Sequence, residues 1–170
     1  MVVNRHNLRW RFPLIALMVL GLGACATPPL APPDPLGPQV TPRAAAAAME
    51  PPPTEQLWGG VIVGLQNRSD HTRIEVVSYP LRQQEPLTER MTNGRFLLEV
   101  SGFLDPLDHR SGRRITARGP VSRTETGWIG EVKYLFPVMD AREYHLWPEG
   151  SPRERGSGAV RFGVGIGIGL

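Results

Sequence analysis

A proline-rich segment limits how much of this chain can fold into a compact domain. Residues 26–56 contain ten prolines, a run of five alanines and almost no large apolar side chain. Such a composition cannot bury enough apolar surface to offset the conformational entropy lost on folding. We therefore expect a disordered, partly polyproline-like tether, whose fully extended length is roughly 90 Å at about 3.1 Å per residue.

Apolar periodicity begins only at Leu57 and ends near Pro148. Short runs rich in Val, Ile and aromatic residues alternate with polar side chains, and clusters of Gly, Asn and Asp separate them, which is typical of strands joined by turns. Residues 58–65 and 72–81 predict an antiparallel hairpin around a turn at residues 67–70. The sequence therefore predicts one all-β domain of residues 57–150 with five or six strands.

Glycines inside the expected strands bear on the architecture of this domain. They permit sharp coiling, which favours a small closed barrel of the oligonucleotide/oligosaccharide-binding (OB) shape. A small two-sheet β-sandwich is the alternative. Just under a hundred residues are enough for a single hydrophobic core.

The first 24 residues have the pattern of a bacterial export signal. Three arginines and no acidic residue precede an apolar core at residues 12–20, which is too short to span a bilayer. The four residues at its end resemble the lipobox of bacterial lipoproteins and are Leu22, Gly23, Ala24 and Cys25.

Cys25 is the only cysteine of the chain, and lipoprotein maturation attaches diacylglycerol to such a thiol before cleavage. We expect Cys25 to carry the lipid, with further acyl chains making the anchor stable, because one chain alone binds a membrane marginally. An ordinary secretory signal cut after Ala24 is the alternative. In similar lipoproteins an aspartate after the cysteine retains the protein in the inner membrane, so Ala26 indicates sorting to the outer membrane, by default on its periplasmic face. The expected partners are the membrane and the lipoprotein maturation and sorting machinery.

The charge balance argues against a nucleic-acid partner. The chain has 19 basic and 16 acidic residues, and three of the basic ones precede Cys25, which leaves 16 of each. A neutral mature chain lacks the basic footprint that phosphate backbones require. With Cys25 acylated, no thiol remains for a disulfide, for catalysis or for a metal site.

One basic cluster stands out, and its members are Arg110, Arg113, Arg114 and Arg118. This cluster is a candidate site for the phosphates of a lipid or a polyanion, and a solvated, charged strand face is the alternative. The histidines lack metal-ligand spacing, and no nucleophile motif is present. Glu75, Glu99 and Glu131 are candidates for a carboxylate pair, although such residues on outer strand faces are usually solvated. We therefore expect no catalytic residue, metal or cofactor.

Several short motifs occur together in the domain, at residues 58–62 (WGGVI), 74–81 (IEVVSYPL), 94–96 (GRF), 102–106 (GFLDP), 130–131 (GE) and 145–148 (HLWP). In combination they resemble the Slp family of outer-membrane lipoproteins. The resemblance implies an OB-like domain and a starvation- or stationary-phase-inducible protein of Gram-negative bacteria, with no catalytic residue and no established ligand. His109 stands where a tyrosine often follows the Asp-Pro motif.

The sequence favours a non-enzymatic outer-membrane lipoprotein with a role in envelope maintenance or binding. An envelope hydrolase or a carbohydrate-binding accessory lipoprotein is the alternative, which two close carboxylates in a cleft would favour. The partner would be an envelope protein or a glycan. Residues 151–170 form a glycine-rich tail, in which glycine alternates with Val, Ile and Leu over residues 163–170. This tail is expected to be adhesive, or else simply flexible.

Overall fold

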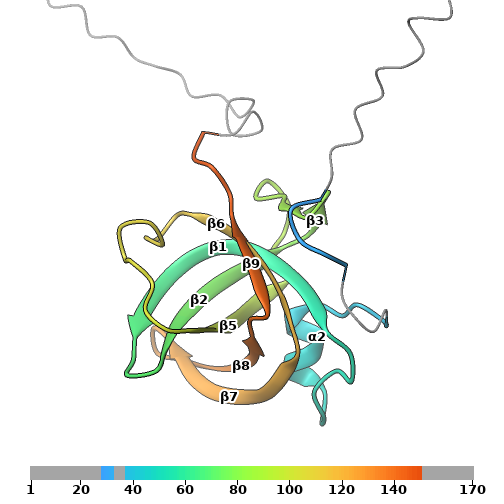
Figure 1. Ribbon diagram of the computed structural model, residues 1–170. Coiled ribbons are helices and arrows are strands. Elements are labelled where there is room, and N and C mark those ends of the chain that lie inside the picture. The colour runs from blue at the N-terminus through green and yellow to red at the C-terminus, as the bar shows by residue number, and fades with distance from the viewer. Residues whose placement is uncertain (1–27, 33–36, 151–170) are drawn as a thin grey trace, which may run out of the picture.

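The computed structural model describes residues 28–32 and 37–150, and most of this part of the chain is β-strand. Seven strands form one mixed sheet in the order β7-β8-β5-β2-β1-β6-β9 (Figure 1). Their bounds are β1 Gln56–Asn67, β2 His71–Tyr79, β5 Gly94–Ser101, β6 Arg114–Gly119, β7 Val121–Ile129, β8 Val132–Asp140 and β9 Glu143–Leu146. The remaining elements are the helix α2 Pro42–Ala47 and a small hairpin of β3 Leu81–Arg82 and β4 Glu85–Pro86. The expected all-β class is confirmed.

Strand alternation in the sequence determines which side chains enter the core. In β2, Thr72, Ile74, Val76 and Ser78 are buried, and the residues between them are more exposed. Antiparallel pairing of β1 with β2, from Gly59↔Tyr79 to Asn67↔Thr72, confirms the predicted hairpin.

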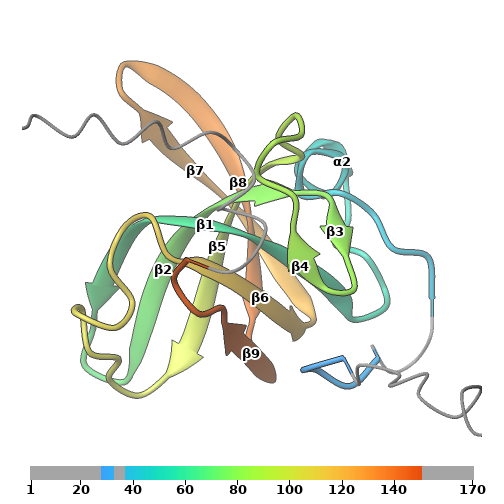
Figure 2. The same ribbon diagram turned by 90° about the horizontal axis from the view of Figure 1, so that it is seen from above.

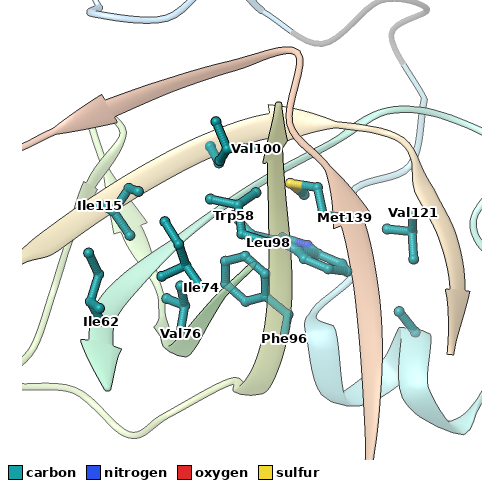
Figure 3. Packing of buried hydrophobic residues seen from close by; sticks show 12 residues of the cluster. Trp58, Ile62, Ile74, Val76, Phe96, Leu98, Val100, Ile115, Val121 and Met139 are labelled. Carbon is teal, nitrogen blue, oxygen red and sulfur yellow. The ribbon is translucent and has the colours of Figure 1, made fainter. Parts of the chain in front are cut away.

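The core lies on the inner face of the coiled sheet (Figure 3). Trp58 and Phe96 meet edge to face with ring centroids 5.2 Å apart. The indole Nε1 of Trp58 donates a hydrogen bond to the Val40 carbonyl at 2.7 Å, so the buried ring keeps a polar partner. The residues of the cluster labelled in Figure 3 are Trp58, Ile62, Ile74, Val76, Phe96, Leu98, Val100, Ile115, Val121 and Met139.

The expected closed barrel is wrong, and so is the alternative of two packed sheets. The strands form a single large sheet whose edges are β7 and β9, and β5 pairs with β8 in parallel. Only Pro120 separates β6 from β7. One nearly continuous stretch of chain therefore forms β7 at one edge of the strongly coiled sheet and β6 next to the other edge (Figures 1 and 2). Proline has no N–H to donate to a neighbouring strand, and the Pro120 carbonyl instead accepts from the Asp140 amide at 3.0 Å.

The expectation of a disordered tether fails for the described part of residues 26–56. Helix α2 places Ala45 in the core with 3% of its surface exposed. Gln56 is fully buried, and its Oε1 accepts from the Val40 amide at 2.8 Å while its Nε2 donates to the Thr54 carbonyl at 3.0 Å. Side-chain amides and small alanines thus let this segment pack on the sheet, which its composition alone does not reveal.

Some of the expectations concern residues outside the described part of the chain. These are the signal peptide of residues 1–24, the lipobox, Cys25 and the tail at residues 151–170. Within residues 28–32 and 37–150, there is no helix with the length and apolar character that a membrane span requires.

Candidate functional site

Strands β7 and β8 leave the body of the sheet as a two-stranded ribbon. Strand β8 pairs with β5 only from Leu97↔Val138 to Glu99↔Asp140, whereas β7 and β8 stay paired out to Ile129↔Val132. The ribbon therefore diverges from the sheet, as Figure 2 shows. A pocket of about 310 Å³ opens between the two.

Both walls of this pocket combine polar and apolar side chains. The sheet contributes Gln66, Arg73 and Glu75 beside Leu65 and Leu97, and the ribbon contributes Glu125 and Thr126 beside the rings of Trp128 and Phe136. Trp128 is 67% exposed, so most of its side chain is accessible to a ligand. An exposed ring in such a pocket can pack against one face of a ligand while the polar side chains bind its polar groups.

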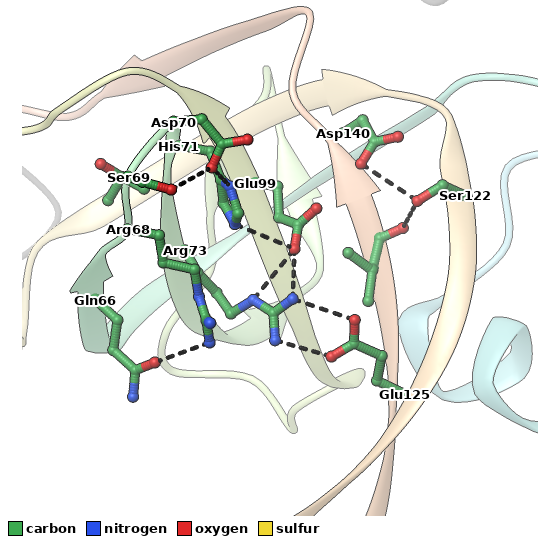
Figure 4. Close-up of polar contacts among 12 residues, drawn as sticks. Gln66, Arg68, Ser69, Asp70, His71, Arg73, Glu99, Ser122, Glu125 and Asp140 are labelled. Carbon is green, nitrogen blue, oxygen red and sulfur yellow. Dashed lines mark hydrogen bonds and ion pairs between the residues drawn. The ribbon is translucent and has the colours of Figure 1, made fainter.

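Four charged side chains connect the ribbon to the sheet, and Figure 4 labels Arg73, Glu99 and Glu125 among them. Arg73 on β2 lies opposite Glu99 on β5, and their Nη2 and Oε1 atoms are 2.5 Å apart. Arg73 Nη1 also contacts Glu125 Oε2 on β7 at 2.8 Å. Arg123 completes the network, because its Nη2 lies 2.8 Å from Glu99 Oε1 and its Nε donates to Glu125 Oε1 at 2.8 Å. Each arginine thus contacts both glutamates.

This network keeps both carboxylates ionised. Burial alone would raise the pKa of Glu99 and of Glu125, but hydrogen bonds and charge from Arg73 and Arg123 outweigh burial and lower both pKa values. A general acid in a hydrolase needs a carboxyl group whose pKa is raised. The two glutamates therefore do not supply one.

Acid is expected to weaken the link between ribbon and sheet. Because the folded-state pKa values of Glu99 and Glu125 lie below their ordinary value of 4.5, the stability they contribute is complete above pH 4.5 and is lost as the pH falls below it. We expect the double variant Glu99→Gln/Glu125→Gln to lower the free energy of unfolding at neutral pH by about 1 to 2 kcal/mol, a range limited by solvent screening. Urea unfolding measured across this pH range should show a flatter pH dependence than the wild type. Glu131→Gln at the exposed ribbon tip is the control, and an equal loss there would contradict the assignment.

The four arginines predicted as an anion-binding patch do not all lie together in the structure. Arg110 and Arg113 both contact Glu149 beside a smaller pocket of about 260 Å³. Arg114, which also lines that pocket, is buried and pairs with Glu85 at 2.7 Å.

Arg118 lies elsewhere on β6, where it contacts Glu55 at 2.7 Å and Glu143 at 3.0 Å. Each of the four arginines thus has a carboxylate partner. Anion binding by this set stays a prediction, and an anion there would have to compete with Glu149.

The carboxylate candidates are also separated. Glu99 meets Glu125 through the arginines, Glu75 pairs with Arg95 at 2.6 Å, and Glu131 is exposed at the ribbon tip. Sequence reasoning missed the partners of Glu99, because Arg73 and Glu125 come from strands far apart in the chain. Alternation of Arg123 and Glu125 on one strand face was the available signal. Among the described residues, no three His, Asp or Glu side chains gather in a way that could hold a metal ion.

A sequence model of the outer membrane lipoprotein Slp family matches residues 22–162. The chain therefore belongs to this family, which confirms the resemblance seen in the short motifs, and it is an outer-membrane lipoprotein.

Two curated relatives from Escherichia coli (strain K12) match the domain. The uncharacterized lipoprotein YeaY is 37% identical over 94 residues, which are 55% of this chain and 48% of the relative. The outer membrane protein Slp is 30% identical over 91 residues, which are 53% of this chain and 48% of the relative. The chain thus spans about half the length of the curated relatives it matches.

One solved structure, the mitochondrial single-stranded DNA-binding protein Rim1 of S. cerevisiae, aligns with a TM-score of 0.34 at 13% identity. The alignment covers 54% of this chain and 92% of that one. A TM-score of 0.34 does not establish a shared fold.

Proposed function

We propose that the domain is a non-enzymatic binding module of the outer membrane, and that the pocket between the sheet and the β7–β8 ribbon holds its ligand. The pocket itself, which an exposed tryptophan lines together with polar side chains, is the observation that carries this proposal. The family resemblance supports a role in envelope maintenance under nutrient limitation.

An envelope glycan is the ligand class that suits the pocket. The apolar face of a sugar ring packs on an indole such as that of Trp128, and sugar hydroxyls bind planar side chains such as those of Gln66 and Arg73. Hydrolysis has less support than binding, because a glycoside hydrolase needs one protonated carboxyl group and the pKa values of Glu99 and Glu125 are lowered.

The anchor is part of the same proposal. Family membership and the residues Leu22, Gly23 and Ala24 support lipid attachment at Cys25 after processing by the maturation and sorting machinery. Acyl chains on Cys25 would hold the protein in the membrane. We place the domain on the periplasmic side.

Trp128→Ala is expected to weaken glycan binding about tenfold or more, as loss of a central aromatic contact does in other interfaces. Chemical-shift titration of the full mature chain with water-soluble peptidoglycan disaccharide-peptides measures this change. Phe103→Ala is the matched control, because Phe103 is 72% exposed but lies on the β5–β6 loop and does not line the pocket. Equal affinity in the wild type and Trp128→Ala, or shifts confined to other surfaces, would contradict the proposed site.

A further inference from the structure

Five residues beyond Cys25, the chain is fixed to the body of the domain. The Leu30 amide donates to Gln84 Oε1 at 2.9 Å, and Gln84 Nε2 donates to the Leu30 carbonyl at 2.8 Å. Only 6% of the Leu30 surface is exposed. One side-chain amide thus satisfies both backbone groups of Leu30, as a neighbouring strand would.

The β3–β4 turn holds Gln84 in place for this contact. Gln83 and Gln84 have φ angles of 50° and 67°, in the left-handed region that residues other than glycine adopt at a cost. The turn is tied to β6 twice, because Thr116 Oγ1 donates to the Gln84 carbonyl at 2.7 Å and Glu85 pairs with Arg114 at 2.7 Å. Leu30 is therefore linked through this turn to the main sheet, and Figure 1 shows residues 28–32 in blue beside β3.

We propose that this contact holds the domain against the lipid surface, with the β3–β4 turn facing the headgroups. The proposal rests on acylation of Cys25. Five residues from Cys25 to Leu30 span at most about 18 Å when fully extended. The free tether expected from the sequence would instead have allowed a separation of roughly 90 Å.

The surface around the turn suits this location. Arg82 on β3 and Arg90 beyond β4 are exposed, and neither forms an ion pair within the described residues, although Glu89 beside Arg90 is exposed as well. The two arginines would attract the phosphates of headgroups, and Glu89 would partly offset this attraction. In Figure 1, β7 and β8 lie on the side of the molecule opposite to β3. In this orientation, the pocket between the sheet and the β7–β8 ribbon would face away from the membrane.

Fluorescence quenching by lipids measures this orientation. Full-length acylated protein is placed in vesicles of phosphatidylethanolamine and phosphatidylglycerol that carry a headgroup nitroxide, with a fluorophore on Arg82→Cys or on Val132→Cys at the ribbon tip. We expect strong quenching at position 82 and weak quenching at position 132. Equal quenching at both positions would overturn the proposal.

Glycine substitutions at the neighbouring positions 83 and 84 distinguish the effect of the Leu30–Gln84 contact from the effect of the backbone conformation of the turn. Glycine at position 84 adopts the positive φ without strain, but Gln84→Gly removes the side-chain amide that holds Leu30. The fluorophore at position 82 should therefore lose most of its quenching. Gln83→Gly relaxes the same turn and leaves Gln84 in place, so quenching should be retained. If Gln84→Gly is quenched as strongly as Gln83→Gly, the contact does not set the orientation.

Two measurements on the wild-type protein separate failure of this proposal from failure of the anchor. Slow hydrogen exchange of the Leu30 amide is expected, and fast exchange in a protein whose intact mass includes lipid would overturn the docking alone. A mass without lipid on Cys25 would overturn the proposed anchor, and the orientation with it.

Discussion

Glu55→Ala is expected to lower the free energy of unfolding by about 3 to 5 kcal/mol, the usual cost of removing one partner from a buried ion pair. Glu55 is 4% exposed, and its carboxylate contacts Arg118 Nη1 and Arg142 Nε at 2.7 Å each. The Arg118 side chain is only 11% exposed, so water cannot fully replace the lost carboxylate. Urea unfolding of the mature chain at neutral pH measures the change.

Glu143→Ala is the matched control for this prediction. Glu143 contacts the same arginine at 3.0 Å, but its side chain is 44% exposed. Removal of an exposed partner is expected to cost less than about 1 kcal/mol. Similar losses for Glu55→Ala and Glu143→Ala would show that burial of Glu55 contributes little. A small loss for both would indicate that the segment before β1 does not stay packed on the sheet.

Local pattern predicts the β1–β2 hairpin and most of the core. Strict alternation in β2 places Ile74 and Val76 on one face, and the polar residues at 67–70 form the turn between the strands. Both signals lie within about 25 residues of chain, so no knowledge of distant pairing is needed.

The arrangement of the outer strands could not be predicted in the same way. Whether the sheet closes depends on the pairing of its edge strands and on the parallel contact of β5 with β8, and neither leaves a mark in local sequence. The error over residues 37–55 has a related cause. Proline and alanine content predicts disorder on its own, but burial of Ala45 and Gln56 depends on a surface formed by distant strands.

The residues of the candidate site also come from distant parts of the chain. Arg73 and Glu99 face each other across β2 and β5, and the ribbon brings Glu125 to them from 26 residues beyond Glu99. The sequence identified Glu99 as a candidate carboxylate. It could not identify the neighbours of Glu99, because they come from strands that are far apart in the chain.

Gly60→Ala is expected to destabilise the domain by at least about 3 kcal/mol, the upper end of the range for overpacking. A Cβ atom at Gly60 would lie 1.9 Å from the Val77 carbonyl oxygen and 2.7 Å from the Val77 carbonyl carbon. Both atoms belong to the backbone of β2, so no side-chain rotation relieves the clash. Strands β1 and β2 must separate instead, which disrupts the hairpin next to Trp58 and Val76 in the core. Urea unfolding monitored by circular dichroism measures the loss, and if the variant does not fold, its spectrum shows this directly.

Gly64→Ala, four residues along the same strand, provides the control for Gly60→Ala. A Cβ atom at Gly64 would meet only Glu75, at 3.7 Å from its Cβ, which is an ordinary van der Waals distance. Because alanine loses less backbone entropy than glycine on folding, this variant is expected to be neutral or more stable by up to about 1 kcal/mol. The sign of the effect should therefore differ between the two glycines. If Gly60→Ala is tolerated as well as Gly64→Ala, β1 and β2 do not approach each other as closely as the structure places them.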